Sequence, residues 1–123
     1  METPTLYRWS DIEVEQLNPL LQRQYVHGTQ AMLTRFHLSK GSVVPLHSHA
    51  NEQISFVLEG SLQFDFPESD KPTHIVNSGE ILIIPGGVPH SAVALLDTLA
   101  FDVFAPPRQD WINKEDAYLR SSR

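Results

Sequence analysis

Two histidines separated by a single residue, His47 and His49, are the side chains in this sequence best suited to bind a metal ion. Because successive side chains of a β-strand point to opposite faces, these two imidazoles would lie on one face and could bind one cation. Gln53 follows four residues later with the same parity, and His90 comes directly after a turn of proline and glycine residues. The pattern predicts a metal site with three nitrogen ligands and one oxygen ligand, formed by His47, His49, Gln53 and His90.

The elements that must position these side chains are β-strands. Apolar and polar residues alternate with a period of two, and turn-forming residues recur every eight to twelve positions, which is typical of antiparallel β-structure. Several segments are apolar on both faces, which favours two curved sheets that enclose an interior. We therefore expect an all-β sandwich or barrel whose interior can hold a ligand. The predicted strands are residues 30–38, 43–49, 53–59, 61–66, 73–77, 80–84, 91–95 and 98–104.

The length of the chain, 123 residues of which 41% are hydrophobic, predicts one domain with a single core. Residues 1–21 mix proline, asparagine and acidic residues with aromatic ones, so we expect an N-terminal arm on a barrel formed by residues 30–104. Exchange of this arm between subunits would give a homodimer. The C-terminal tail, residues 105–123, is predicted to contain a short helix with Asn113 as its N-terminal cap.

The composition excludes several classes of function. A net charge of −6 and only three lysines argue against a nucleic-acid partner, because such binding needs a clustered basic surface. The chain has no cysteine, which excludes disulfides, thiolate metal sites and thiol nucleophiles. It has neither the apolar core of a secretory signal nor an apolar run long enough to span a membrane. We therefore expect a cytoplasmic protein with a small-molecule partner.

The segments that carry the candidate ligands resemble the paired motifs of the cupin superfamily. Residues 41–60 follow the first motif, which is glycine, His-x-His, an acidic residue and a second glycine, except that Gln53 takes the place of the acid. The second motif is met in full by Gly79, Pro85, Gly87 and His90. This resemblance implies a double-stranded β-helix, or jelly-roll barrel, with a metal ion bound inside it.

A narrower resemblance comes from residues 44–53 and 102–111, which are similar to the corresponding stretches of KdgF, a cupin family of pectin degradation. Members of that family open the ring of 4,5-unsaturated uronate monosaccharides, released from pectin or alginate, to give 5-keto-4-deoxyuronate. The resemblance implies a small anionic sugar acid as substrate. It makes His47, His49, Gln53 and His90 the metal ligands, and it places Asp102, Phe104 and Arg108 at the substrate.

Each of these residues also has a plainer reading. Glu52 could coordinate in place of Gln53 if a bulge follows His49. Asp102 lies in an apolar strand, so it faces either a polar cavity or solvent near an edge. Phe104 could be simply core, and Arg108 could form a surface ion pair instead of presenting a planar fork to a carboxylate. Three other histidines lack partner spacing and are read as surface or packing residues: His27, His37 and His74.

The ligand set predicts the chemistry. Three neutral imidazoles and a neutral amide leave the full charge of a divalent ion available, which suits an anionic substrate. Lewis acidity would favour ring opening, with Asp102 as the base that removes a hydroxyl proton. Nickel, zinc, iron, manganese or cobalt would each suit this donor set. Two alternatives use the same site: an iron-dependent dioxygenase, and a non-catalytic cupin that binds a sugar acid or a metal.

Overall fold

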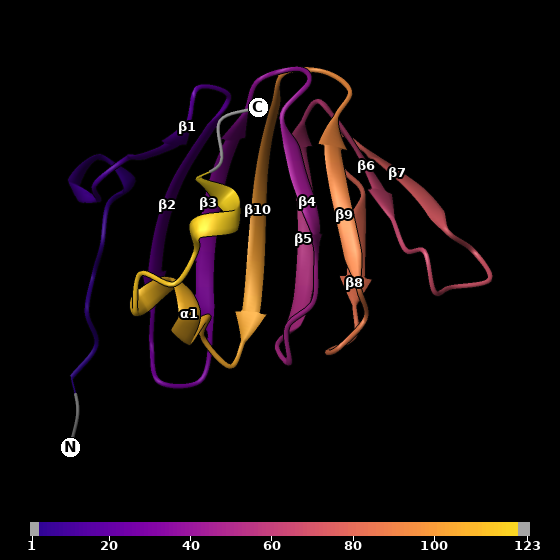
Figure 1. Ribbon diagram of the computed structural model, residues 1–123. Helices are drawn as coiled ribbons and strands as arrows, with labels where there is room; N and C mark the ends of the chain where they lie inside the picture. Colours follow the sequence, from indigo (N-terminus) through magenta and orange to yellow (C-terminus); the bar gives the residue numbers. More distant parts are fainter. Residues whose placement is uncertain (1–2, 121–123) are drawn as a thin grey trace.

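Ten antiparallel strands in two sheets form the body of the protein in the computed structural model, which describes residues 3–120 (Figure 1). The larger sheet has the strand order β1 (Glu15–Asn18), β2 (Leu21–His27), β3 (Met32–Leu38), β10 (Thr98–Ala105), β5 (Glu52–Glu59) and β8 (Ile81–Ile84). The smaller sheet has the order β4 (Val43–His47), β9 (His90–Ala94), β6 (Ser61–Asp65) and β7 (Thr73–Asn77). The expected all-β jelly-roll fold is confirmed.

The core lies between the two sheets, as the alternation of residues predicts. Along β10 the buried residues Ala100, Asp102 and Phe104 point inward, while Phe101 and Val103 between them point outward. Gly60 joins β5 to β6 where the chain passes from one sheet to the other, with φ at +105°. A β-carbon there would collide with the side chain of Thr98 and the carbonyl of Asp97, so only glycine fits this crossing.

Strands β1 and β2 are the elements that the sequence analysis missed: β1 lies within the predicted arm, and β2 has a core pattern that the sequence disguises. The inward positions of β2 are Leu21, Arg23 and Tyr25, and the middle one is a charged residue that is 1% exposed. An arginine at a core position hides the apolar alternation on which the prediction of strands depends. The remaining strands agree with the predicted ranges to within two residues at each end.

The N-terminal segment lies against the outer face of the larger sheet. A short 3-10 helix, η1 (Trp9–Asp11), places the ring of Trp9 6.0 Å from that of Phe101 and within 5.7 Å of the Arg35 guanidinium carbon. Gln24 donates hydrogen bonds to the carbonyls of Trp9 and Ile12. The arm therefore ends before Glu15, because residues 15–18 already form an edge strand of the sheet. Exchange of the arm in a homodimer stays a prediction.

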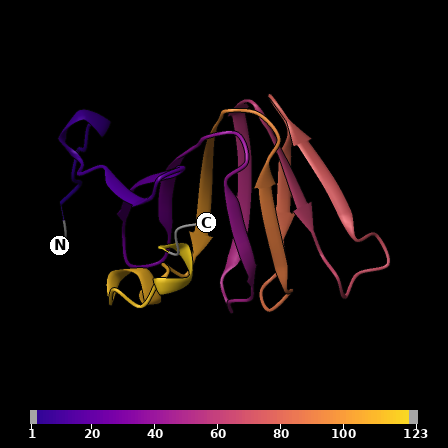
Figure 2. The same cartoon turned by 45° about the horizontal axis from the view of Figure 1, so that its top comes forward.

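The C-terminal tail folds back over one end of the barrel, as the view in Figure 2 makes clear. It contains one helical turn, α1 (Gln109–Ile112), and a 3-10 turn, η2 (Ala117–Leu119). The predicted helix that begins at Asn113 is wrong, because Asn113 ends α1 and donates its backbone N–H to the carbonyl of Gln109. Among residues 3–120, no helix is long and apolar enough to cross a membrane.

Candidate metal centre

The three candidate histidines meet at one end of the barrel, between the two sheets. His47 is the last residue of β4 and His90 is the first of β9, and the two are paired across the ladder. His49 lies in the loop after β4 instead of on the strand. The alternation of side chains along a strand therefore does not explain why His49 points to the same side as His47. The metal-binding atoms of the three side chains nevertheless lie within 4.8 Å of one another.

The turn before His90 fixes this loop in place. The N–H of Gly87 donates to the carbonyl of His49 at 2.8 Å. Gly86 lies so close to the loop that a β-carbon there would collide with the carbonyl oxygen of Ala50. The Pro-x-Gly sequence thus provides the close approach of two loops, and this approach brings His49 to the other histidines.

Each histidine is oriented by its own backbone. Nδ1 of His47 lies 2.8 Å from the carbonyl of Pro45, that of His49 lies 3.1 Å from the carbonyl of Asn51, and that of His90 lies 2.8 Å from the carbonyl of Val88. A carbonyl can only accept, so each Nδ1 carries the proton and each Nε2 carries a lone pair. Nε2 of His90 is buried without a hydrogen-bond partner among residues 3–120. The structure therefore has an unsatisfied buried acceptor where a cation would be bound.

Gln53, and not Glu52, lies beside the histidines. Gln53 is 5% exposed and its Oε1 lies 3.1 Å from Nε2 of His49, whereas Glu52 is exposed. The Gln53 amide group also donates from Nε2 to Oγ of Ser55 at 3.0 Å, which orients its oxygen toward the histidines. Of the two residues left open by the sequence, the structure brings only Gln53 into reach of the site.

Burial keeps the histidines neutral. Desolvation lowers the pKa of both His47 and His49 to about 4, with a further contribution from the positive charge of Arg108, and burial also lowers the pKa of His90. Their hydrogen bonds to backbone carbonyls act in the opposite direction but are weaker. At neutral pH all three rings are therefore unprotonated at Nε2 and able to bind a metal ion.

Asp102 faces the same interior from β10. It is 8% exposed, and burial raises its pKa to about 6, although a hydrogen bond from Ser55 and the charge of Arg108 both act to lower it. Asp102 lies opposite Ser55 in the β10–β5 ladder, so the Ser55 hydroxyl connects this carboxyl group to the amide of Gln53. The sequence left open whether Asp102 faces a polar cavity or solvent near an edge, and the structure shows that it faces the cavity.

Arg108 is buried at the start of the tail and is 2% exposed. Its Nε and Nη2 pair with the two carboxylate oxygens of Asp110 at 3.0 and 2.8 Å, and Nη2 also donates to the hydroxyl of Tyr118 at 2.7 Å. Its guanidinium carbon lies 5.1 Å from the centre of the Phe104 ring and 4.4 Å from that of Trp111. The expected planar fork is therefore already used by Asp110. Within residues 3–120, Nη1 is the nitrogen that is left for a ligand.

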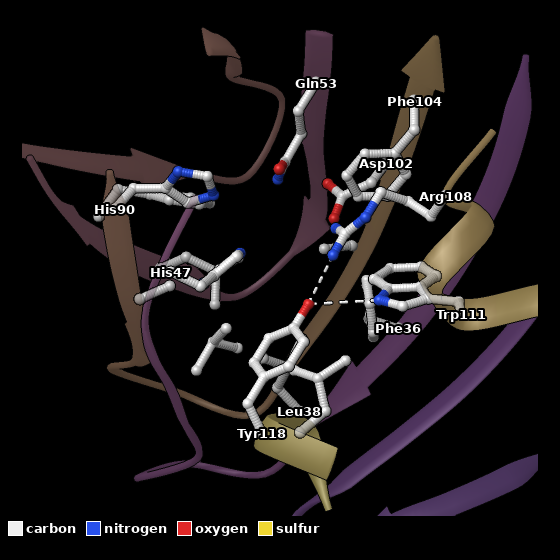
Figure 3. Close-up of a pocket in the computed structure, with 16 residues that line it drawn as sticks. Phe36, Leu38, His47, Gln53, His90, Asp102, Phe104, Arg108, Trp111 and Tyr118 are labelled. Carbon is white, nitrogen blue, oxygen red and sulfur yellow. Dashed lines mark hydrogen bonds between the residues drawn. The ribbon is translucent and has the colours of Figure 1, made fainter. Parts of the chain in front are cut away.

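The site forms a pocket of about 50 Å³ that is partly open to solvent. Figure 3 shows His47 and His90 on one wall, Asp102 and Arg108 on the opposite wall, and Tyr118 between them. Phe104 is 1% exposed and packs against His49 and Trp111, so it is both core and pocket wall. Tyr118 was missed by the sequence analysis, since no spacing relates this part of the tail to the histidines.

The structure is thus a two-sheet β-barrel with three neutral histidines gathered inside one end. The profile of the cupin domain family matches residues 34–102, more than half of the sequence, and the chain belongs to this family. The three histidines of the site are placed so that they could hold a metal ion together.

Several solved structures have the same fold as this chain. The chain resembles KdgF from Halomonas sp., with a TM-score of 0.79 and 25% identity over 89% of this chain and 99% of that one. It is similar to an RmlC-like cupin from Shewanella frigidimarina, with a TM-score of 0.78 and 24% identity over 89% and 96% of the two chains. The fold also matches oxalate decarboxylase from Lactobacillus farciminis, with a TM-score of 0.72 and 18% identity over 91% and 39%. No curated protein sequence matches the chain.

Proposed function

We propose that this protein is a metal-dependent cupin enzyme that opens the ring of 4,5-unsaturated uronate monosaccharides to give 5-keto-4-deoxyuronate. The observation that carries the proposal is the meeting of a neutral donor set and a buried carboxyl group, Asp102, in one pocket. The likeness to KdgF from Halomonas sp. over nearly the full length of both chains supports it.

The donor set fits a single divalent transition metal ion. Nε2 of His47, His49 and His90, with Oε1 of Gln53, would hold it, because each is a neutral acceptor with no proton to remove. Nickel, zinc, iron, manganese and cobalt all suit these ligands. When bound, such an ion supplies Lewis acidity and an attraction for the carboxylate of the substrate.

Asp102 is the residue that we assign to proton transfer. A pKa of about 6 means that a substantial fraction of this group is ionised at neutral pH, yet it remains basic enough to accept a proton. In the proposed reaction it removes the proton of the C1 hydroxyl, so that the hemiacetal opens to an aldehyde. The bond between C1 and the ring oxygen breaks with its electron pair on that oxygen, which leaves an enolate. Asp102 then returns the same proton to C4 as the enolate becomes a ketone, and no net proton is consumed.

Arg108 and Phe104 bind the substrate. Nη1 of Arg108 has no hydrogen-bond partner among residues 3–120 and can donate to a carboxylate, and Asp110 holds the guanidinium group in position. Phe104 presents an apolar wall beside His49. A pocket of this volume holds a carboxyl group but not a whole monosaccharide. A sugar acid would therefore enter with its charged group first and leave its ring at the open side.

The test is an anaerobic assay of the purified, metal-analysed protein with 4,5-unsaturated galacturonate. Loss of the ultraviolet absorbance of the conjugated double bond is followed against the slow spontaneous reaction. We expect acceleration that a chelator abolishes and a divalent metal restores. Absence of acceleration by protein that is fully loaded with metal would refute the ring-opening function.

The small volume of the pocket favours a second candidate, an iron-dependent dioxygenase that acts on a compact carboxylate. This enzyme would use the same histidines but would need iron and would consume oxygen. Oxygen uptake measured with an electrode, together with loss of activity in zinc-loaded protein, separates the two candidates. If neither reaction occurs, binding of a carboxylate without turnover assigns the chain to the non-catalytic sugar-acid or metal binders.

A further inference from the structure

Tyr118 reaches the pocket from η2, in the C-terminal tail. Its hydroxyl oxygen accepts two hydrogen bonds, one from Nη2 of Arg108 at 2.7 Å and one from Nε1 of Trp111 at 3.3 Å, drawn as dashed lines in Figure 3. Both partners are obligate donors, because a guanidinium group and an indole N–H cannot accept. The phenol is therefore an acceptor in both contacts, and its own proton is committed to neither.

That proton has no protein acceptor within hydrogen-bond distance among residues 3–120. The ring of Tyr118 lies 5.0 Å from that of His47, and the residue lines the pocket together with Asp102. With two donors already on one side of the oxygen, the remaining O–H direction is toward the interior between the histidines and Arg108 (Figure 3). A ligand in the pocket is thus offered this hydrogen.

Arg108 has a matching shortage of donors. Nε and one N–H of Nη2 go to Asp110, and the other N–H of Nη2 goes to Tyr118, so Nη1 is the one guanidinium nitrogen without a hydrogen-bond partner among residues 3–120. A carboxylate bound to the arginine would accept a hydrogen bond from Nη1 with one of its oxygens. Its second oxygen would then need another donor. The hydroxyl of Tyr118 is adjacent to Nη2 and is the donor available there.

We infer that Tyr118 is a ligand-binding residue whose O–H, together with Nη1 of Arg108, selects a carboxylate over an uncharged group at the wall opposite the histidines. Asp110 and Trp111 act as positioning residues: Asp110 fixes the arginine from outside the pocket, and the indole N–H of Trp111, which lines the pocket, fixes the phenol. The inference rests on the proposed function only for the choice of a sugar acid as ligand. It makes the C-terminal tail a part of the binding site as well as a cover for the barrel.

The experiment compares binding of D-galacturonate and of its methyl ester to zinc-loaded protein by calorimetry, so that no turnover is needed. In wild type we expect the acid to bind more tightly than the ester. Tyr118→Phe keeps the ring against His47 and removes only the hydroxyl. It should weaken binding of the acid roughly tenfold, the usual effect of losing a hydrogen bond to a charged group, with the ester almost unaffected.

Tyr25→Phe is the matched control, because Tyr25 also packs against Trp111 but does not line the pocket. A tyrosine ultraviolet difference band that forms on binding of the acid should be present in wild type and Tyr25→Phe and absent in Tyr118→Phe. Equal losses for acid and ester, no preference for the acid in wild type, or an unchanged band in Tyr118→Phe would each overturn the inference. If the protein fails the ring-opening assay but still binds the acid more tightly than the ester, the proposed reaction is refuted and the role of Tyr118 stands.

Discussion

The imidazole of His49 and the amide of Gln53 face each other, with Nε2 of the histidine 3.1 Å from Oε1 of the glutamine. Because Nδ1 of His49 donates to the carbonyl of Asn51 and Nε2 of Gln53 donates to Ser55, both facing atoms carry lone pairs. Two acceptors at this distance repel each other unless a cation is bound between them. The contact is thus best explained by a metal site that includes an amide ligand.

Gln53→Glu tests the consequence of that neutral ligand. A carboxylate in this position adds a negative charge next to the metal, so we expect divalent metal affinity to rise about tenfold or more in competition with a chelator. Affinity for an anionic ligand should fall, because part of the metal charge is cancelled. Glu52→Gln, at the exposed neighbour, should leave both quantities unchanged. A larger effect from Glu52→Gln would mean that Glu52 is the ligand.

His90→Ala tests the metal site itself. Removal of this imidazole leaves two histidines, so we expect bound metal, measured by elemental analysis of the purified protein, to fall from about one ion per chain to a small fraction. His74→Ala is the matched control, since His74 lies outside the histidine cluster. A metal ion that binds only the native state, at a free concentration of about a hundred times its dissociation constant, stabilises that state by about 2.7 kcal/mol. The metal-dependent rise in Tm should therefore be present in His74→Ala and absent in His90→Ala.

The sequence was sufficient for the fold and for much of the site because both depend on local patterns. The alternation of residues predicts the strands around Asp102, and the paired motifs bring His47, His49 and His90 together. The remainder depends on contacts between distant segments. Arg23 is buried only because Glu15 and Asp116 neutralise it, and Tyr118 reaches the pocket only because the tail folds back. Neither fact leaves a periodic signal in the sequence.

The ion pairs that anchor the tail give a stability prediction. Nη2 of Arg23 lies 2.7 Å from Oδ2 of Asp116, and these side chains are 0% and 1% exposed. Asp116→Ala leaves a buried guanidinium with Glu15 as its one ion-pair partner among the described residues, so we expect a loss of about 3 kcal/mol in the free energy of unfolding. Asp11→Ala, which breaks an exposed pair with Arg8 at 3.9 Å, should cost less than about 1 kcal/mol. Urea denaturation measures both, and equal losses would contradict the anchoring role of Asp116.

Asp102→Asn should make the metal-free protein more stable and the enzyme nearly inactive. The ordinary pKa of the carboxyl group, 3.8, applies to the unfolded chain, and burial raises it to about 6 in the native state. Well below pH 3.8 the Asp102 carboxyl group is protonated in both the unfolded and the native state, so it does not change the free energy of unfolding. As pH rises toward 6 the unfolded chain ionises first, so the native state loses stability, and above pH 6 the full penalty of about 3 kcal/mol remains.

In the Asp102→Asn variant, the amide that replaces the carboxyl group does not ionise. The gain in unfolding free energy of Asp102→Asn over wild type should therefore grow from about 0.5 kcal/mol at pH 4 to as much as about 3 kcal/mol at pH 8, measured by urea denaturation at each pH. Asp70→Asn, in an exposed turn, should show no such dependence. In the ring-opening assay the same variant should retain its metal and lose about 10² to 10⁴ in turnover. A stability difference that is independent of pH would mean that Asp102 is ionised throughout this range, which would remove the basis for its role as a base near neutral pH.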